Sequence, residues 1–273
     1  MELDGRIAVI TGGAKGIGYA LAEAFLAEGA SHVVVVDLSP AEVSAAAERL
    51  GERAHGFALD VSDAAALVDL VEVVERTFGP IGLFVSNAGI GTGSGIETTD
   101  AMWDRIWRVN VLAHVHAARA VLPPMLERGE GYLLSTASAA GLLAQIGDLP
   151  YSVTKHAAVA VAEWLAITYG DRGITVSCLC PQGVRTDLLA SAMGSTSVET
   201  VVAQGVIEPS DVAAAVVAGL ATEQFLILPH PEVADYYQRR ATQPDRWLAG
   251  MRRLQSRILG ALEEPAPEEP DPA

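Results

Sequence analysis

A glycine-rich stretch, Thr11-Gly-Gly-Ala-Lys-Gly-Ile-Gly18, directly follows an apolar run at 7–10. The run indicates a buried strand, and apolar residues recur with helical spacing at 19–27. Glycine permits positive φ and close backbone approach to a ligand, and a helix start offers unpaired N–H groups to a phosphate. The stretch therefore predicts a phosphate-binding loop, with Gly-x-x-x-Gly-x-Gly in place of the usual Gly-x-Gly-x-x-Gly. An ordinary glycine-rich turn is the alternative.

Strand and helix patterns alternate along most of the chain. Apolar segments rich in β-branched residues indicate strands at 32–37, 54–59, 81–86, 131–135 and 174–179, with helical patterns between them. Such alternation implies a parallel sheet with helices on both faces, joined by right-handed crossovers. We predict an α/β fold in which residues 1–262 form a single Rossmann-type, doubly wound domain. Within it we expect a substrate loop at about 187–207 and a helical C-terminal cover at about 229–262.

Charge and cysteine content limit the partners and the compartment. The net charge of −16 argues against binding to nucleic acid or to an anionic membrane, which are themselves negative. The longest apolar runs fall short of the ~18 residues of a membrane span, and an early first strand leaves no place for a signal peptide. Cys178 and Cys180 are poorly placed for a disulfide with each other, which favours reduced thiols and a cytoplasmic location. The acidic, proline-rich tail at 263–273 is predicted to be disordered.

Asp37 ends the second predicted strand, 19 residues after Gly18. A carboxylate at this place can accept hydrogen bonds from an adenosine ribose and repel a 2′-phosphate, which predicts NAD rather than NADP. Lys15 is a conflicting signal, because a basic residue beside Gly16 could meet a 2′-phosphate. A helix N-cap is the alternative role for Asp37, although Ser39 and the proline after it already supply a helix start.

Tyr151 and Lys155 are four residues apart on a predicted helix, so their side chains share one face. Asn110 lies near the apolar face of a predicted helix at 99–119. Taken separately, these residues are equally compatible with a core tyrosine, a surface lysine and a satisfied core amide. We expect His114, His116 and His156 to be partly exposed helical residues, and we predict no metal site, because they lack a metal-ligand pattern.

Taken together, the motifs strongly resemble the short-chain dehydrogenase/reductase family over residues 6–228. The matches occur in the family's order: Gly12-x-x-x-Gly16-x-Gly18, Asp37, Asp60, Asn87-Ala88-Gly89, Asn110, Ser138, Tyr151-x-x-x-Lys155 and the turn at 181–186. Gln182 departs from the family pattern, which usually has glycine directly after the proline. This departure would reshape the turn or bring Gln182 into the active site.

The resemblance implies a catalytic set of Asn110, Ser138, Tyr151 and Lys155. Tyr151 would be the general base, with its pKa lowered by Lys155 and by the charge of NAD⁺. Ser138 would polarise the substrate oxygen, and Asn110 would bind a water in a proton relay. The same resemblance implies that the cofactor NAD contacts Tyr151 and Lys155 together with Gly12, Lys15, Gly16, Ile17, Gly18, Asp37, Asp60, Val61, Asn87, Ala88, Gly89, Val184 and Thr186.

We therefore expect an NAD-dependent oxidoreductase that interconverts a secondary alcohol and a ketone. A hydrophobic substrate, namely an alcohol, a ketone or a steroid-like hydroxyl, is favoured because few charges occur among the surrounding residues, which are Ala139, Ala140, Leu142, Leu143 and 188–193. A 3-oxoacyl-thioester reductase is an alternative, as is a non-catalytic NAD-binding regulatory or scaffold protein.

Several further positions stay open at this stage. Gln145 and Asp148 could touch substrate or lie in a solvated loop. Trp247 and Met251 could cover the pocket or pack on the sheet. Apolar residues on more than one face of the helix that starts at Tyr151 favour a homodimer or homotetramer.

Overall fold

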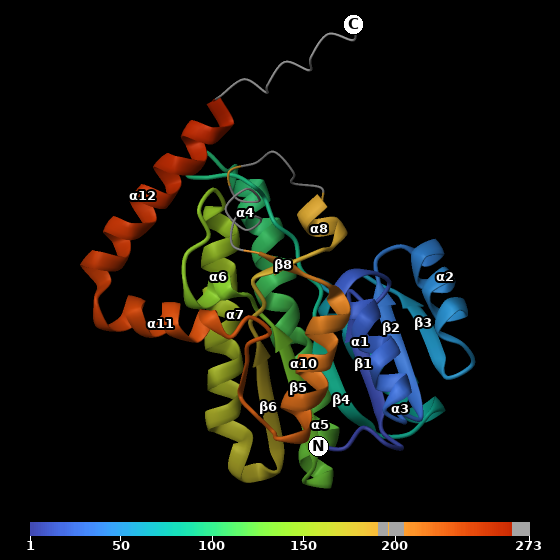
Figure 1. Ribbon diagram of the computed structural model, residues 1–273. Coiled ribbons are helices and arrows are strands. Elements are labelled where there is room, and N and C mark those ends of the chain that lie inside the picture. Colours follow the sequence, from blue (N-terminus) through green and yellow to red (C-terminus); the bar gives the residue numbers. More distant parts are fainter. Residues whose placement is uncertain (191–195, 197–204, 264–273) are drawn as a thin grey trace, which may run out of the picture.

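The computed structural model describes residues 1–190, 196 and 205–263, and a seven-stranded parallel sheet forms the centre of this described part. The strands are β1 (Ile7–Thr11), β2 (His32–Asp37), β3 (Ala54–Ala58), β4 (Ile81–Ser86), β5 (Gly131–Thr136), β6 (Ile174–Leu179) and β9 (Leu226–Ile227). Their order across the sheet is β3-β2-β1-β4-β5-β6-β9 (Figure 1). A short separate pair joins β7 (Gly183–Val184) to β8 (Val206–Ile207).

Helices cover both faces of the sheet. The described helices include α1 (Gly16–Ala27), α2 (Pro40–Leu50), α3 (Ala64–Thr77), α4 (Asp100–Trp107), α5 (Ala113–Arg128), α6 (Ala139–Leu142), α7 (Leu149–Tyr169), α8 (Asp187–Ala190), α10 (Pro209–Ala221), α11 (Glu232–Thr242) and α12 (Pro244–Glu263). The π-helical turn η1 (Arg108–Leu112) joins α4 to α5, and the 3₁₀ turn η2 (Gly170–Arg172) follows α7. Helices α1 and α10 pack on one face, and α3, α5 and α7 pack on the other (Figure 1). These observations confirm the predicted doubly wound α/β fold.

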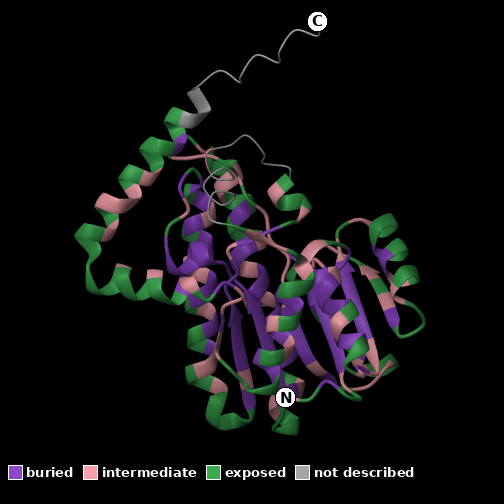
Figure 2. Cartoon of the chain, in the orientation of Figure 1, coloured by how far each residue is buried: buried purple, intermediate pink, exposed green. Residues whose placement is uncertain are grey.

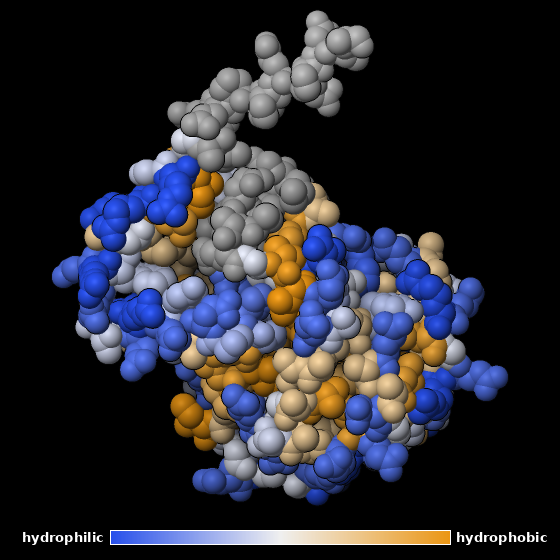
Figure 3. Space-filling model, viewed as in Figure 1, coloured by the Kyte–Doolittle hydropathy of each residue, from blue (hydrophilic) through white to orange (hydrophobic). Residues whose placement is uncertain are grey.

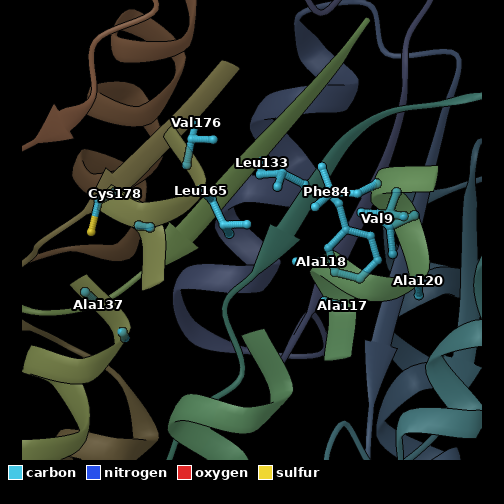
Figure 4. Packing of buried hydrophobic residues seen from close by; sticks show 14 of the residues in the cluster. Val9, Phe84, Ala117, Ala118, Ala120, Leu133, Ala137, Leu165, Val176 and Cys178 are labelled. Atoms are coloured by element: carbon cyan, nitrogen blue, oxygen red, sulfur yellow. The ribbon is translucent and has the colours of Figure 1, made fainter. Parts of the chain in front are cut away.

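Alternate residues of the strands enter two separate hydrophobic cores. Figure 2 shows that the strands at the centre of the sheet are largely buried. Val9 and Phe84 point toward α3, α5 and α7, and Figure 4 shows them packed with Ala117 and Leu133. Ala8 and the other alternate residues point toward α1 and α10. Because both faces of the sheet are covered, the strands carry continuous apolar runs rather than an alternation of apolar and polar residues.

The chain reverses its direction across the sheet between β1 and β4. It adds β2 and β3 on one side of β1, then returns to add β4, β5, β6 and β9 on the other side. In open α/β sheets a crevice forms at such a switch point, outside the carboxyl ends of the strands. The glycine stretch after β1 and Asn87 after β4 both lie at this point.

The helix predicted at 99–119 is interrupted rather than continuous. It is divided by η1, which contains Asn110, and α5 continues through Pro123 and Pro124 to Arg128. A single π-helical turn widens a helix locally and is frequent at functional sites. Ser138 caps the short helix α6, because its hydroxyl accepts a hydrogen bond from the Ala140 N–H.

The expectation of a partly exposed His114 is also wrong. This side chain is 3% exposed, because α5 contacts the sheet and also packs against α3 and α7. A helix covered on more than one side buries polar positions that a single apolar stripe would leave exposed.

The C-terminal cover is helical, as expected, and α12 extends along the margin of the molecule (Figure 1). Glu263, which we assigned to a disordered tail, is the last residue of α12. The rest of that tail, 264–273, and much of the predicted substrate loop, 191–195 and 197–204, lie outside the described residues. Within the described part, every helix is too short or too polar to cross a membrane.

Candidate active site

A cavity of about 1100 Å³ lies at the carboxyl ends of the parallel strands. Of the predicted site residues, Gly18 and Asn110 do not line it. Those that do are Gly12, Lys15, Gly16, Ile17, Asp37, Asp60, Val61, Asn87, Ala88, Gly89, Ser138, Tyr151, Lys155, Val184 and Thr186. Residues far apart in the chain therefore meet here because parallel strands place the loops that follow them at one edge of the sheet.

The glycine stretch has the shape of a pyrophosphate cradle. Gly12 and Gly16 have φ of +63° and +56°, and a Cβ at Gly12 would lie 2.9 Å from the Ala88 Cα. A Cβ at Gly16 would be 3.2 Å from the Thr186 Cγ2, so side chains at either position would fill the space. Because α1 begins at Gly16, its unpaired N–H groups lie beside this space. The residues present thus fit a dinucleotide.

Gly18 shapes the loop from behind. A Cβ at this position would lie 2.1 Å from the Gly12 carbonyl oxygen, so any side chain there would force the backbone of the loop to shift. Asn87 ties the same loop to the end of β4, because its Nδ2 donates to the carbonyl oxygens of Thr11 and Gly12 at 3.0 and 3.2 Å. The close approach of Gly18 to Gly12 and the hydrogen bonds of Asn87 together fix the backbone of the cradle.

Asp37 and Lys15 differ in how they are held. The Asp37 carboxylate lines the cavity and accepts hydrogen bonds from the N–H groups of Ala14 and Leu38, at 3.2 and 2.8 Å. The Lys15 ammonium lies 3.4 Å from a Glu42 carboxylate oxygen and 3.9 Å from one of Asp187. The charges around this end of the cavity are therefore predominantly negative.

Ser138, Tyr151 and Lys155 converge beyond the cradle. The Tyr151 hydroxyl is hydrogen-bonded to Ser138, and the Lys155 Nζ lies 5.6 Å from the centre of the tyrosine ring. Lys155 is itself buried, and its Nζ donates to the Thr136 carbonyl oxygen at 2.9 Å. A phenol, a hydroxyl and an ammonium thus lie together at one wall of the cavity.

Burial is the largest cause of the pKa shifts of Tyr151 and Lys155. It raises the pKa of Tyr151 to about 12, although the hydrogen bond from Ser138 acts in the opposite direction. Burial also lowers the pKa of Lys155 to about 8. We expected Lys155 to lower the pKa of Tyr151, but in the protein alone the loss of water around the phenol outweighs the favourable interactions.

Asn110 holds the loop that follows β4. Its Oδ1 accepts from the Ile90 N–H at 2.9 Å, while its Nδ2 donates to the Ile90 carbonyl oxygen and to the Thr154 hydroxyl. The side chain is therefore occupied within the protein, and the expected water-binding role of Asn110 stays a prediction.

Asp148 is a buried clamp that also lines the cavity, so of the two roles that the sequence left open the structure excludes the solvated loop residue. Its carboxylate accepts hydrogen bonds from the Thr92 hydroxyl and from the N–H groups of Thr92, Gly93 and Tyr151, at 2.7 to 3.1 Å. It joins the loop after β4 to the first turn of α7, which carries Tyr151. An acidic N-cap before Pro150 was the available sequence signal for part of this role.

Other lining residues carried no sequence motif. Gln145 lines the cavity, as do Leu188, Arg105 of α4 and Arg108 of η1. Gln182, the position that departs from the family pattern, also lines it. The Gln182 N–H donates to His230 Nδ1 at 3.2 Å, so a side chain from the segment after β9 holds the turn.

Comparison with known proteins gives the same family. A family model described as short chain dehydrogenase matches residues 6–195. The chain is 36% identical to 2-(S)-hydroxypropyl-CoM dehydrogenase 3 of Xanthobacter autotrophicus over 79% of this chain and 89% of that protein. It is 34% identical to 3beta-hydroxysteroid dehydrogenase 2 of Eggerthella lenta over 68% of this chain and 74% of that protein.

Solved structures agree. A short-chain dehydrogenase/reductase from Burkholderia phymatum in complex with NAD superposes with a TM-score of 0.83 at 28% identity, covering 90% of this chain and 96% of that one. The chain belongs to the short-chain dehydrogenase/reductase family and is an oxidoreductase acting on hydroxyl groups.

Proposed function

We propose that this protein is an NAD-dependent oxidoreductase that interconverts a hydrophobic secondary alcohol and its ketone. The observation that carries the proposal is that Ser138, Tyr151 and Lys155 line the same cavity as the glycine cradle and Asp37. A scaffold that only bound a nucleotide would have no chemical need for a buried ammonium and a phenol beside the cradle.

The chain's own residues supply proton transfer and orientation. The Tyr151 hydroxyl exchanges a proton with the substrate oxygen, giving it during ketone reduction and taking it during alcohol oxidation. Ser138 donates a hydrogen bond that orients this oxygen and stabilises charge on it. Lys155, charged below its pKa of about 8, favours the tyrosinate form. When bound, NAD would supply the hydride acceptor or donor.

The preference for NAD rests on the residues around the adenosine end of the cradle. Asp37 lines the cavity where a ribose would lie, and it would repel a 2′-phosphate. Lys15, which could have attracted that phosphate, lies near Glu42 and Asp187. A neighbouring solved structure is a complex with NAD, which agrees with this choice.

The lining near the reaction centre supports an uncharged organic substrate. Leu188 lies with Tyr151 around Gly91, Leu189 also lines the cavity, and one of the two relatives named above is a steroid dehydrogenase. We therefore propose an apolar alcohol or ketone, a class that includes steroid-like hydroxyl compounds.

The test is an assay of NADH and NADPH formation with a panel of secondary alcohols, and of their oxidation with ketones. We expect turnover with NAD, and we expect Tyr151→Phe to abolish turnover while NAD binding, measured by calorimetry, is retained. Thr98→Ala, a partly buried residue outside the cavity lining, is the control. Unchanged turnover of Tyr151→Phe would refute the assignment.

The same assay separates the alternatives. Turnover confined to 3-oxoacyl thioesters with NADPH would identify a thioester reductase. Binding of NAD without turnover of any alcohol or ketone would identify a regulatory or scaffold protein.

We also propose a homodimer or homotetramer. On the outer side of α7, Trp164 is 58% exposed and Ile167 is 84% exposed, although both are large and apolar. Burying such side chains against a second copy would remove apolar surface from water. Light scattering of the wild type and of Ile167→Glu tests this, because a dimer that uses this face should dissociate in the variant.

A further inference from the structure

A second cavity lies beyond the reaction centre, between the segment around α6 and the C-terminal cover. It has a volume of about 260 Å³. Ala139, Ala140 and Leu143 line one side, and Trp247, Met251 and Leu254 of α12 line the other. Among the described residues that line it, none is charged. Figure 3 shows the corresponding polarity of α12, with polar residues on its outer side and hydrophobic residues on the side turned toward the body.

The cover is attached to the rest of the molecule next to this cavity. The Arg240 guanidinium of α11 donates a hydrogen bond to the Leu142 carbonyl oxygen at the end of α6. The ring centres of Tyr236 and Trp247 lie 6.3 Å apart, and both side chains pack against the core that contains Val9 and Phe84. Helix α12 is therefore fixed as one wall of the cavity by contacts at its start.

The two cavities share a boundary. Gln145 and Gln182 line both of them, and Ala139 directly follows Ser138 in the chain. The two glutamines thus form a common wall, and a substrate whose reacting oxygen meets Ser138 and Tyr151 would have to pass them to reach the apolar surroundings.

We propose that this second cavity is a subsite for the non-reacting apolar arm of the substrate, and that Met251 and Leu254 limit the length of that arm. The proposal rests on the proposed function, since it assumes that an alcohol or ketone reacts at Tyr151. The substrate class it names is an unsymmetrical secondary alcohol or ketone with one small group and one medium alkyl or alicyclic arm.

The volume and the polarity of the second cavity determine which substrate arm it can hold. At about 30 Å³ for each water-sized group, the cavity holds roughly eight such groups, which corresponds to a medium chain rather than a long acyl chain. The absence of charge among the described lining residues disfavours an anionic arm, because a buried unpaired carboxylate is strongly penalised.

A series of 2-alkanols from 2-butanol to 2-dodecanol tests the subsite with the intact protein. In the wild type, kcat/KM should rise about fourfold for each methylene until the cavity is filled, then level off. Met251→Trp, which narrows the cavity by roughly two methylene-sized groups, should lower kcat/KM for 2-octanol at least about tenfold and leave 2-butanol within about twofold. Leu254→Ala, which enlarges it, should move the plateau to longer alcohols.

The matched control is Leu248→Ala, since Leu248 is on the same helix, is 54% exposed and does not line the cavity. Its chain-length profile should equal that of the wild type. A flat profile in the wild type, or equal effects of Met251→Trp and Leu248→Ala, would overturn the subsite.

Failure of the proposed function gives a different result. If no 2-alkanol is oxidised with either cofactor, calorimetric titration of 2-octanone into the protein with NADH decides the matter. Binding that is at least about tenfold weaker in Met251→Trp than in Leu248→Ala supports an apolar subsite without that reaction. Equal affinities overturn it.

Discussion

His114 should make the folded protein sensitive to mild acid. It is buried in α5, and within the described structure neither of its ring nitrogens has a hydrogen-bond partner. Burial, and then the charge of Lys155, lower its pKa from 6.5 to about 3. Below pH 6.5 the unfolded chain binds a proton at this imidazole and the folded chain does not, so lowering the pH stabilises the unfolded state.

The magnitude follows from the difference in protonation. A pH of 5 lies about 1.5 units below the pKa of the imidazole in the unfolded chain, and one unit corresponds to about 1.4 kcal/mol. The free energy of unfolding at pH 5 is therefore about 2 kcal/mol lower than at pH 7. The loss continues as the pH falls toward 3. Because the folded imidazole is essentially unprotonated at pH 5, the result does not depend on the exact depth of the shift.

Urea titrations at pH 7 and pH 5 measure this loss through the free energy of unfolding. His114→Asn and His114→Leu both remove the titration, so each variant should lose about 2 kcal/mol less than the wild type between the two pH values. The two variants differ in polarity and need not be equally stable at pH 7. If all three proteins show the same loss between pH 7 and pH 5, the reasoning about His114 is refuted.

Three further substitutions have defined outcomes. Gly18→Ala places a Cβ against the Gly12 carbonyl, so it should lower the free energy of unfolding by about 1–3 kcal/mol and weaken NAD binding in calorimetry. Gly260→Ala is the control, because open space surrounds Gly260 and the substitution should be neutral or stabilising. Equal effects of the two substitutions would contradict the cradle geometry. Asp148→Ala should lower the free energy of unfolding by about 3 kcal/mol in urea titrations and reduce kcat, with partial rescue by Asp148→Asn, because charge-assisted hydrogen bonds are lost. Asp37→Ser should raise kcat/KM with NADP at least about tenfold, and an unchanged cofactor ratio would argue against charge repulsion as the basis of selectivity.

Much of the site could be predicted from sequence because its motifs are local. Gly12 and Gly16 follow a strand and open a helix, and Tyr151 and Lys155 are separated by about one helical turn. Such spacings keep their meaning whatever the rest of the chain does, since they depend on backbone geometry within a few residues. The order of strands and helices likewise determined the parallel sheet.

Contacts between distant segments were not predictable in the same way. Asp148 meets Thr92 only because α7 and the loop after β4 are brought to the same edge of the sheet. Asn110 was identified as a site residue, yet its bonds to Ile90 and Thr154, and its place in η1, became visible in the fold alone.

The sequence by itself thus determined the fold class and the glycine-rich turn between β1 and α1, because each follows from periodicity or spacing over a few residues. The assignment of Ser138, Tyr151 and Lys155 as reacting side chains came from the resemblance to the family and stays a proposal. Tertiary structure decided the burial of His114, the raised pKa of Tyr151 and the cavity beneath α12. Each of these depends on how much water is excluded by segments far away in the chain, and local sequence patterns carry no measure of that exclusion.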